Sequence, residues 1–415
     1  MKIAIVGSGI AGLTCAYLLN RQHDIQVFEA SDWIGGHTHT VDVQVEGRSY
    51  AIDTGFIVFN DWTYPNFIRL LGQVGVGFKP TEMSFSVSDP ATGVEYNGHD
   101  LNTLFAQRSN LLSPAFWGML RDILRFNRQS LDDLANNRID ADTTLGQYLE
   151  RNGYGRRFIE HYIVPMGSAI WSMSLADMLG FPLQFFVRFC KNHGLLSVSD
   201  RPTWQVIEGG SRSYVAPLTA SFAERIRLNC PVSRVVRDQD GVTLHSAAGA
   251  ERFDKVIFAC HSDQALALLE QPSEQEQDIL GALPYANNDV VLHTDTRLLP
   301  KRKLAWASWN YRLGGPTDQP AAVTYNMNIL QGVEADTTFC VSLNQTAAID
   351  PGKILARFQY AHPQYSLAGT AAQARWEELL GAQHSYYCGA YWANGFHEDG
   401  VVSALRVARA FGETL

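Results

Sequence analysis

The sequence predicts an α/β protein in two domains, one of which is built on a parallel sheet that starts at the first residues. Residues 3–6 are a short, wholly apolar run, typical of a strand buried on both faces of a parallel sheet. The run leads directly into G-S-G-I-A-G at residues 7–12, and residues 25–28 give a second apolar strand. A chain of 415 residues exceeds what a single small core can organise, which indicates the second domain.

Each glycine of the first turn has a physical role. Gly7 permits a tight turn, Gly9 lets the backbone approach a pyrophosphate, and Gly12 lets the next helix pack close to the strand. Apolar residues then recur at helical spacing over residues 10–18, which predicts an amphipathic helix. The N-terminus of this helix would present free N–H groups to phosphates.

An acidic residue, Glu29, follows the second strand and can accept hydrogen bonds from the ribose of an adenosine. Its charge would repel a 2′-phosphate, and residues 30–32 offer no arginine, so NADP is not expected. The order strand, glycines, helix, strand and acid predicts a Rossmann-like dinucleotide site. The alternative is an ordinary βαβ unit with a glycine-rich turn.

The next segments indicate which dinucleotide binds. Residues 35–38 read G-G-H-T and residues 50–55 read Y-A-I-D-T-G. With the first motif, these resemble the two-glycine flavoprotein superfamily, which includes amine oxidases, phytoene-type desaturases, protoporphyrinogen oxidases and UDP-galactopyranose mutases. The resemblance implies FAD, with the glycine doublet along the ribityl and pyrophosphate and the D-x-G turn near the isoalloxazine.

The resemblance resumes at two later stretches. Residues 229–235 and 254–259 resemble the second FAD segment of the superfamily, in which a valine backbone, here Val232, meets the adenine. Gly389 and the run G-F-H-E-D-G-V at residues 395–401 resemble its C-terminal flavin segment. The helix that follows would point its N-terminus at the flavin N1–C2=O edge, where negative charge develops on reduction.

One departure from the superfamily concerns the residue after the glycine doublet, where many relatives carry arginine and this chain has His37. Histidine cannot copy the fixed fork of arginine but can bond through one ring nitrogen. Covalent attachment of the flavin through His37 stays open. The resemblance implies FAD contacts at Gly7, Ser8, Gly9, Ile10, Ala11, Gly12, Glu29, Ala30, Gly35, Gly36, His37, Thr38, Thr54, Gly55, Val232, Gly389, Phe396, Gly400 and Val401.

The three matching stretches imply a discontinuous layout with the flavin at the interface between domains. Residues 1–75, 204–269 and 386–415 are expected to form the FAD-binding domain. Residues 76–203, expected to be largely helical, and 270–385, of mixed α+β character, would form the substrate-binding domain.

Composition excludes some functions. Apolar residues make up 46% and charged residues 18% of the chain, as in globular proteins. With 33 basic and 42 acidic residues the formal charge is −9, which argues against a nucleic-acid partner. Six scattered cysteines without a C-x-x-C pair indicate reduced thiols, and no metal site is expected. No apolar run approaches the ~18 residues of a membrane span, so we expect a cytoplasmic protein, peripheral to a membrane at most.

Two apolar stretches bear on the substrate. Residues 116–131 combine apolar side chains with Arg121, Arg125 and Arg128, a pattern that fits either a membrane-surface helix or a domain helix with a solvated face. The aromatics of residues 181–189 could line a lipophilic tunnel or pack into a core.

The expected reaction is removal of a hydride from a substrate carbon to flavin N5, which needs alignment and excluded water. Amine oxidases of the superfamily often place a lysine near N5, but the roughly corresponding residues 287–292 contain none. His397 is the candidate general acid or base, and bonding to the C-terminal segment is its alternative role. Glu398 and Asp399 are expected to cap or charge the helix that follows.

The leading hypothesis is an FAD-dependent dehydrogenase or desaturase acting on a small lipophilic substrate, such as a fatty acyl chain. Residues 309–311 and 395–400 resemble a subgroup of bacterial amine-oxidase-like flavoproteins, some of which are linked to modified fatty-acid metabolism. The alternatives are an amine oxidase that makes peroxide, a redox-neutral isomerase or mutase, and a non-catalytic flavin-binding protein. The electron acceptor stays open.

Overall fold

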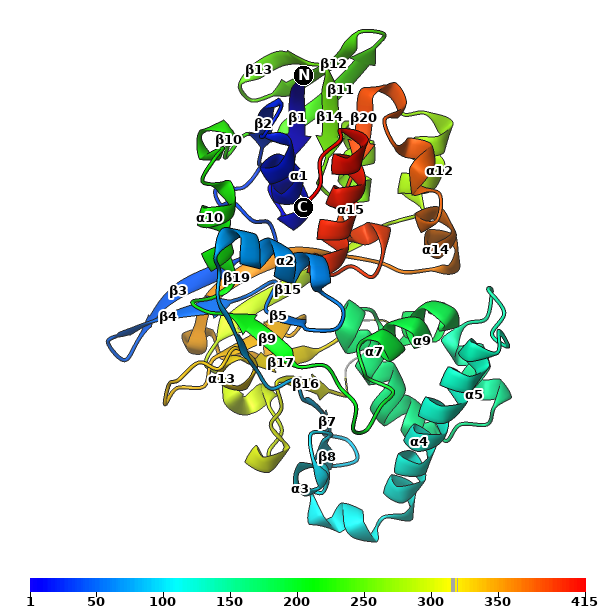
Figure 1. Cartoon of the computed structure of the whole chain (residues 1–415). Helices are drawn as coiled ribbons and strands as arrows, with labels where there is room; N and C mark the ends of the chain where they lie inside the picture. Colours follow the sequence, from blue (N-terminus) through cyan, green and yellow to red (C-terminus); the bar gives the residue numbers. More distant parts are fainter. Residues whose placement is uncertain (315–317, 319) are drawn as a thin grey trace.

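A parallel five-stranded sheet forms one end of the computed structural model, which describes residues 1–314, 318 and 320–415 (Figure 1). Its strand order is β10-β2-β1-β14-β20, and all neighbours are parallel. The strands are β1 (Lys2–Val6), β2 (Asp24–Phe28), β10 (Ile226–Arg227), β14 (Lys255–Phe258) and β20 (Ser385–Tyr387). Three distant stretches of sequence therefore build one sheet, as the α/β prediction required.

Alternate residues of β1 face different layers. Ile3 and Ile5 pack against one layer of helices, α1 (Ile10–Leu19), α2 (Pro65–Val74), α10 (Val215–Thr219) and α15 (His397–Ala410). Ala4 and Val6 pack against the opposite layer. That layer contains β11 (Val232–Asp238), β12 (Gly241–Ser246), β13 (Gly249–Phe253), α11 (Ser262–Leu268), α12 (Glu274–Gly281) and α14 (Leu367–Gln373). Burial on both faces explains why the strand is wholly apolar.

The prediction that α1 is amphipathic was wrong. Every residue of α1 is buried except Tyr17, which is half-buried. The outer face of the helix is covered by α15 and α10, which come from residues far along the chain. A helix that is buried on all sides does not need a polar stripe.

The other half of the molecule contains a seven-stranded sheet of order β19-β15-β18-β17-β16-β7-β8. Only β16 and β7 are parallel neighbours in it. Its strands are β7 (Phe85–Asp89), β8 (Val94–Asn97), β15 (Tyr285–His293), β16 (Trp309–Arg312), β17 (Val323–Asn326), β18 (Cys340–Leu343) and β19 (Ile354–Pro363). Smaller sheets pair β3 (Thr40–Val45) with β4 (Arg48–Asp53), and β9 (Trp204–Ile207) with β5 (Val58–Asn60) and β6 (Phe78–Pro80).

Helices follow on one side of this sheet (Figure 1). They are α4 (Pro114–Ala135), α5 (Leu145–Arg151), α6 (Arg156–Phe158), α7 (Val164–Trp171), α8 (Leu175–Leu179) and α9 (Leu183–Asn192). The short helix α3 (Leu101–Leu104) lies beside β8, and α13 (Met327–Leu330) follows β17. The expectation that residues 76–203 are largely helical fails at its start, where β6, β7 and β8 lie. Ser86 in β7 is buried because its hydroxyl donates to Asn310 of β16 at 2.8 Å, a partner that only the sheet supplies.

The packing also bears on the predicted domain boundaries. Ile279 and Leu280 of α12 and Ala372 of α14 share a core with Val256 and Phe258 of the parallel sheet. Both helices lie beside that sheet in Figure 1, although the predicted boundaries at residues 269 and 386 assign them to the other domain. The division stays a prediction, and this packing favours adding both helices to the FAD-binding domain.

The aromatic stretch at residues 181–189 packs into a core. Phe181 and Phe186 are completely buried, and both contact the ring of Trp171. Phe189 at the end of α9 reaches the N-terminus of α15, where its ring stacks on Phe396 at 5.3 Å between centroids. Of the two interpretations, the structure favours core packing. Within the described residues, no helix is both long and apolar enough to cross a bilayer.

Candidate functional site

The glycine turn between β1 and α1 is closed on one side and open on the other. A Cβ at Gly12 would lie 2.1 Å from the Gly7 carbonyl oxygen, and a Cβ at Gly7 would lie 2.9 Å from the Ala259 carbonyl oxygen. A Cβ at Gly9, in contrast, would meet no heavy atom of the described chain within 4 Å. Gly7 and Gly12 therefore serve packing, while Gly9 faces the open side where a phosphate can approach.

The N-terminus of α1 is free to bind an anion. Gly9 is its N-cap, the described residues supply no side-chain cap, and the first turn contains no acidic residue. The Leu13 N–H donates to the Gly9 carbonyl at 2.9 Å, so the N–H groups of residues 10–12 precede the first intrahelical bond. The glycine doublet lies against this turn, because Gly9 and Gly35 form a β-bridge and a Cβ at Gly36 would lie 3.2 Å from the Gly9 Cα.

The predicted ribose ligand, Glu29, is buried at the end of β2. Its Oε2 accepts hydrogen bonds from the Ser8 N–H at 2.8 Å and the Ser8 hydroxyl at 2.6 Å, and its Oε1 accepts from the Ser31 N–H at 2.9 Å. The Ser31 hydroxyl also donates to Oε1, at 2.5 Å, so four donors already occupy the roughly four acceptor sites of this carboxylate. Ribose hydroxyls would therefore have to replace the hydroxyls of Ser8 and Ser31. The Cys230 N–H donates to the Glu29 carbonyl at 2.8 Å, which brings Val232 and Ala30 to the same end of the sheet.

The C-terminal segment places a second helix N-terminus beside the first. A Cβ at Gly400 in α15 would lie 2.8 Å from Ile10 Cγ2 in α1, so this glycine allows close helix packing. Val401 is completely buried in the same core. Gly389 precedes the helix and donates its N–H to Ser403 Oγ at 2.9 Å. Two partly positive helix ends thus converge on the space beside the glycine turn.

The two acids at the start of α15 cap different helices. Asp399 caps its own helix, because its Oδ2 accepts the Phe396 N–H at 2.9 Å, as expected. Glu398 does not cap α15. Its carboxylate accepts the N–H groups of Asn66 at 3.1 Å and Phe67 at 2.9 Å, so it caps α2 instead. The chain position of Glu398 carries no signal of this contact.

His397 is buried within the parallel-sheet domain. Its Nε2 lies 3.0 Å from Thr38 Oγ1 and 3.2 Å from the Tyr214 hydroxyl, and its ring stacks on Phe56 at 3.4 Å between centroids. Burial, and secondarily the nearby His37, holds the pKa of His397 well below its usual range, so the ring is neutral. The ring thus connects α15 to the segment after the glycine doublet, through partners that no sequence motif indicates.

We predict that His397 acts by holding this segment in place. His397→Gln should lower the free energy of unfolding by about 1–2 kcal/mol and weaken retention of FAD. The pH profile of anaerobic flavin reduction should keep its shape, because no acid or base is removed. Thermal denaturation, flavin absorbance and the pH profile check this; a stable variant that loses one limb of the profile would instead make His397 a catalytic acid or base.

His37 lies among aromatic residues of β19 and the loop before α11. Its ring is 5.2 Å from Tyr360, 5.7 Å from His362 and 6.1 Å from His261, between centroids. Burial lowers the pKa of His37, and its Nε2 has no hydrogen-bond partner among the described residues. A buried nitrogen of this kind is expected to find a partner in a bound group.

The D-x-G turn lies directly beside His37. A Cβ at Gly55 would lie 2.2 Å from the His37 carbonyl oxygen, which excludes any larger residue. The Thr54 hydroxyl donates to the His39 carbonyl at 3.1 Å and lies 2.8 Å from the Tyr360 hydroxyl. The turn, the doublet and the α15 N-terminus therefore meet, and the isoalloxazine contacts expected at this place stay predictions.

Asp53, which precedes this turn, gives a pH-dependent prediction. Its completely buried carboxylate accepts hydrogen bonds from the hydroxyls of Thr40 and Ser211, yet burial raises its pKa to about 6. A raised pKa in the folded state contributes stability that is complete below pH ~4 and lost as pH rises through about 6. The free energy of unfolding of the wild type, relative to Asp53→Asn, should therefore fall by about 3 kcal/mol between pH 4 and 7. Denaturant titrations of both proteins check this, and parallel pH curves would contradict it.

A cavity of about 390 Å³ opens beside Phe396, between the start of α2, the end of α9 and the start of α15. Burial lowers the pKa of His193 to about 4 and raises the pKa of Asp399 to about 6. The residues that line this cavity are Trp62, Thr63, Tyr64, Pro65, Asn192, His193, Asn394, Phe396, Glu398 and Asp399. The sequence pointed only to the last three, because the wall is assembled from three separate segments.

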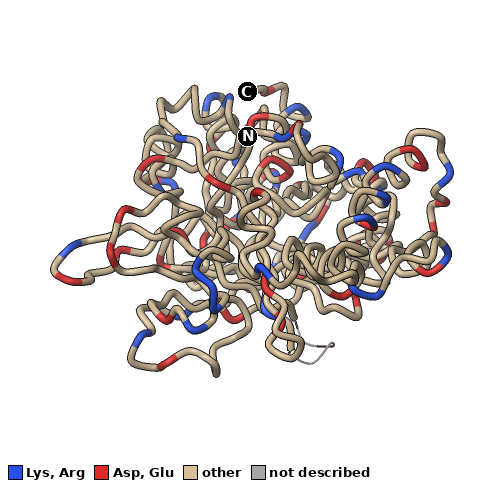
Figure 2. The backbone as a smooth tube through the Cα atoms, turned by 90° about the horizontal axis from the view of Figure 1, so that it is seen from below, with Lys and Arg blue, Asp and Glu red and all other residues tan. Residues whose placement is uncertain are grey.

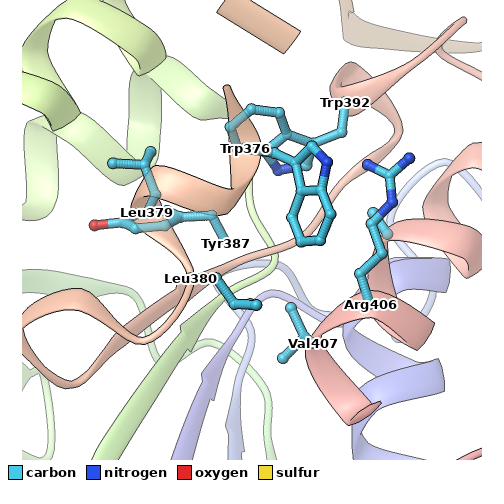
Figure 3. Close-up of a pocket in the computed structure, with 8 residues that line it drawn as sticks. Trp376, Leu379, Leu380, Tyr387, Trp392, Arg406 and Val407 are labelled. Carbon is cyan, nitrogen blue, oxygen red and sulfur yellow. The ribbon is translucent and has the colours of Figure 1, made fainter. Parts of the chain in front are cut away.

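A second cavity lies at the outer side of α15, where Trp376, Tyr387, Trp392 and Arg406 surround it (Figure 3). The Arg406 guanidinium lies over the Trp376 ring at 4.8 Å. The volume of about 10 Å³ suffices for about one water molecule. The cleft beside Phe396 is therefore the candidate substrate site.

An open glycine backbone, two convergent helix N-termini of which only that of α1 is uncapped, a buried acid, and a buried histidine without a partner for its Nε2 among the described residues together fit an adenine flavin. They define an FAD-dependent oxidoreductase. The family model described as flavin-containing amine oxidoreductase matches residues 10–337. The chain belongs to this family. No curated protein matches it in sequence.

Solved structures share the fold over the whole chain. A putrescine oxidase double mutant is 14% identical, covers 99% of this chain and 98% of its own, and has a TM-score of 0.69. Cyclohexylamine oxidase from Brevibacterium oxydans IH-35A is 16% identical, covers 99% of this chain and 98% of its own, and has a TM-score of 0.67. A CLA-producing fatty acid isomerase from P. acnes is 15% identical, covers 99% of this chain and 98% of its own, and has a TM-score of 0.69. Such low identities establish the fold alone.

Proposed function

We propose that this oxidoreductase removes a hydride from a lipophilic substrate, such as a fatty acyl chain, held in the cleft beside Phe396. The observation that carries the proposal is the group of four aromatic rings, Trp62, Tyr64, His193 and Phe396, which form an aromatic wall in a cleft that is otherwise lined mainly by polar and acidic residues. The low pKa of His193 keeps its ring neutral. Such a wall suits an apolar substrate, because burial of apolar surface is its main source of affinity.

The strands beside the flavin seat support the same substrate class. Neither β15 nor β19 contains a lysine. Towards His37, β19 presents Tyr360 and His362, and the His362 Nδ1 lies 2.9 Å from the Ser172 hydroxyl. Burial lowers the pKa of His362 to about 3, so the ring is neutral. These side chains supply no cation beside the flavin seat.

When bound, FAD supplies a two-electron acceptor at its N5 atom. The protein chain would hold the parts of FAD in position and provide the polar groups around them. Residues 10–12 and the glycine doublet would hold the pyrophosphate, and Glu29 the ribose. The N-terminus of α15 would stabilise negative charge at one edge of the ring. Phe189 stacks on Phe396 and so supports one of the rings that line the cleft.

An anaerobic reduction experiment tests the proposal. The yellow holoprotein is mixed with oleic acid, with bacterial lipid extract, and separately with putrescine or cyclohexylamine, while flavin absorbance is followed. We expect the acyl substrates to bleach the flavin. Bleaching by amines alone would overturn the proposal. Conversion of a lipid without net oxidation, and only after dithionite treatment, would replace it with an isomerase.

One observation favours a second candidate, a flavin amine oxidase. Two carboxylates, Glu398 and Asp399, line the cleft, and an ionised carboxylate attracts an ammonium substrate. The attraction is limited because Glu398 already accepts two N–H groups of α2 and Asp399 has a raised pKa. Amine-dependent peroxide formation in air separates this candidate from the first. An empty cleft with no bleaching by any probe would favour a non-catalytic flavin protein.

A cytoplasmic location and contact with a membrane surface belong to the same proposal. Acyl chains are stored in membranes and leave them slowly, so an enzyme that uses them benefits from docking at a bilayer. The absence of a membrane-spanning helix among the described residues is compatible with such docking. Cell fractionation tests the location directly.

A further inference from the structure

Several exposed apolar residues lie on α3 and the segments that follow it, at the end of the molecule drawn at the bottom of Figure 1. Leu112 is 88% and Leu101 76% exposed, and Leu111 and Trp117 are about half exposed. They belong to α3, the 3-10 helix Arg108–Leu112 and the first turns of α4. We call this surface, together with the basic segment described next, the tip. Single exposed leucines are ordinary, but several together indicate a contact surface.

Local contacts connect the elements that carry these four residues. The Trp117 indole N–H donates to the Leu111 carbonyl at 2.9 Å, and the Trp117 ring lies 5.4 Å from Phe105 between centroids. The Arg108 guanidinium donates to the Asn102 carbonyl at 3.1 Å, which connects the 3-10 helix to α3. Because the indole N–H is already bonded, the ring can enter an apolar phase without an unpaired donor.

Positive charge surrounds these apolar residues. Arg108 and Arg121 are exposed on the tip itself. Residues 301–303, Lys-Arg-Lys, are exposed beside α3, where the 3-10 helix Lys303–Ala305 contacts it, and Leu304 is 40% exposed. Glu95 of β8 anchors this segment by accepting the Lys301 N–H at 2.7 Å and the Arg302 guanidinium at 2.8 Å. Figure 2 views the molecule from this end.

Most of these cations are uncompensated. Arg108, Arg121, Lys301 and Lys303 form no ion pair with any residue that the structure describes. The acids nearby are Asp100, which caps α3, Glu95, which pairs with Arg302, and Glu82, which lies 4.0 Å from His99. The tip is therefore locally positive on a chain whose formal charge is −9.

We propose that the tip docks on an anionic lipid bilayer. The leucines and Trp117 would enter the boundary between headgroups and acyl chains, while the cations face anionic headgroups. The chain as a whole is repelled by a negative surface, whereas an approach by the tip combines apolar burial with charge attraction. The inference does not depend on the proposed substrate, because docking needs no turnover.

A second copy of the chain fits the tip less well. Symmetric pairing would place Arg108, Arg121 and residues 301–303 of both copies against one another, and like charges repel. An anionic surface satisfies both the apolar and the charged residues. Self-association is therefore an outcome that the test must distinguish.

Vesicle co-sedimentation of the FAD-loaded protein tests the proposal. Vesicles of phosphatidylcholine alone are compared with vesicles that contain phosphatidylglycerol, at low and at high salt. We expect binding to the anionic vesicles that decreases with salt, and little binding to neutral ones. Both the Leu111→Asp/Leu112→Asp variant and the Lys301→Glu/Lys303→Glu variant should bind at least about tenfold less.

The matched control is the Val198→Asp/Leu228→Asp variant, which adds the same two negative charges as the leucine variant at apolar residues that are 70% and 36% exposed outside the tip. It should bind anionic vesicles as the wild type does. Flavin absorbance and thermal denaturation confirm that each variant is folded. The proposal is overturned if the wild type binds both vesicle types equally or not at all, if the tip variants match the control, or if size exclusion shows a dimer that the leucine variant loses.

Discussion

Gly12→Ala is expected to give a protein that is purified without FAD. The added Cβ would lie 2.1 Å from the Gly7 carbonyl oxygen and 3.1 Å from the Ala259 Cβ, so α1 must move away from β1. Overpacking of this kind costs about 1–3 kcal/mol, and the movement also displaces the N–H groups that would meet the pyrophosphate. We expect at least about a tenfold loss of FAD affinity together with a lower melting temperature. Flavin absorbance, FAD titration of the apoprotein and thermal denaturation measure both effects.

Two further glycines separate packing from cofactor contact. A Cβ at Gly9 meets no described atom within 4 Å, and its φ of −67° suits alanine, so Gly9→Ala should leave the apoprotein stable but weaken FAD binding. Gly118 in α4 has the same open surroundings far from the turn, so Gly118→Ala should reduce neither the stability of the apoprotein nor its affinity for FAD. If Gly9→Ala binds FAD as tightly as Gly118→Ala does, the pyrophosphate does not lie against this turn.

Among substitutions of charged residues, Glu398→Ala should cause a large loss of stability. The carboxylate accepts the N–H groups of Asn66 and Phe67 and the Asn66 side-chain amide at 2.6 Å. Removing it leaves these donors unpaired at the N-terminus of α2, which we expect to lower the free energy of unfolding by about 2–4 kcal/mol. Since α2 and α15 both line the cleft, substrate affinity should fall as well. Denaturant unfolding and the concentration dependence of flavin reduction measure the two effects.

The conservative variant provides the control for this prediction. Glu398→Gln keeps one carbonyl oxygen as an acceptor and removes the charge, so it should recover roughly half of the lost stability. Asp263→Ala alters an exposed acid in the first turn of α11, away from the cleft, and should be nearly neutral. Equal stability of Glu398→Ala and the wild type would show that the contact to α2 contributes nothing to the fold.

The parts of the fold that could be predicted are those written in consecutive residues. The run at residues 3–6, the glycines at 7–12 and Glu29 form one strand–turn–helix–strand unit, and hydrogen bonds and sterics within about thirty residues determine its shape. The parallel sheet followed from this unit. The flavin class followed from the family resemblance, which also needed residues 35–38 and 50–55 and the later stretches. The site contacts proposed for FAD stay predictions, although the structure brings the three stretches together.

The parts that could not be predicted depend on residues distant in the sequence. The burial of α1 on all sides comes from α15, which lies nearly four hundred residues away. Strand β7 carries buried serines because Asn310 bonds one of them. Glu398 looks like a cap for its own helix, yet the approach of α2 offers it two other N–H groups.

By itself, the sequence determined the dinucleotide-binding unit, the parallel sheet and the flavin oxidoreductase class, because turn geometry and strand burial are encoded by neighbouring residues. Only the tertiary structure decided which side chains meet: the neutral His397 between Thr38 and Tyr214, the cleft beside Phe396, and the basic segment at residues 301–303 beside the exposed leucines. Packing of whole elements fixes these contacts, and no local pattern records where a distant segment will dock.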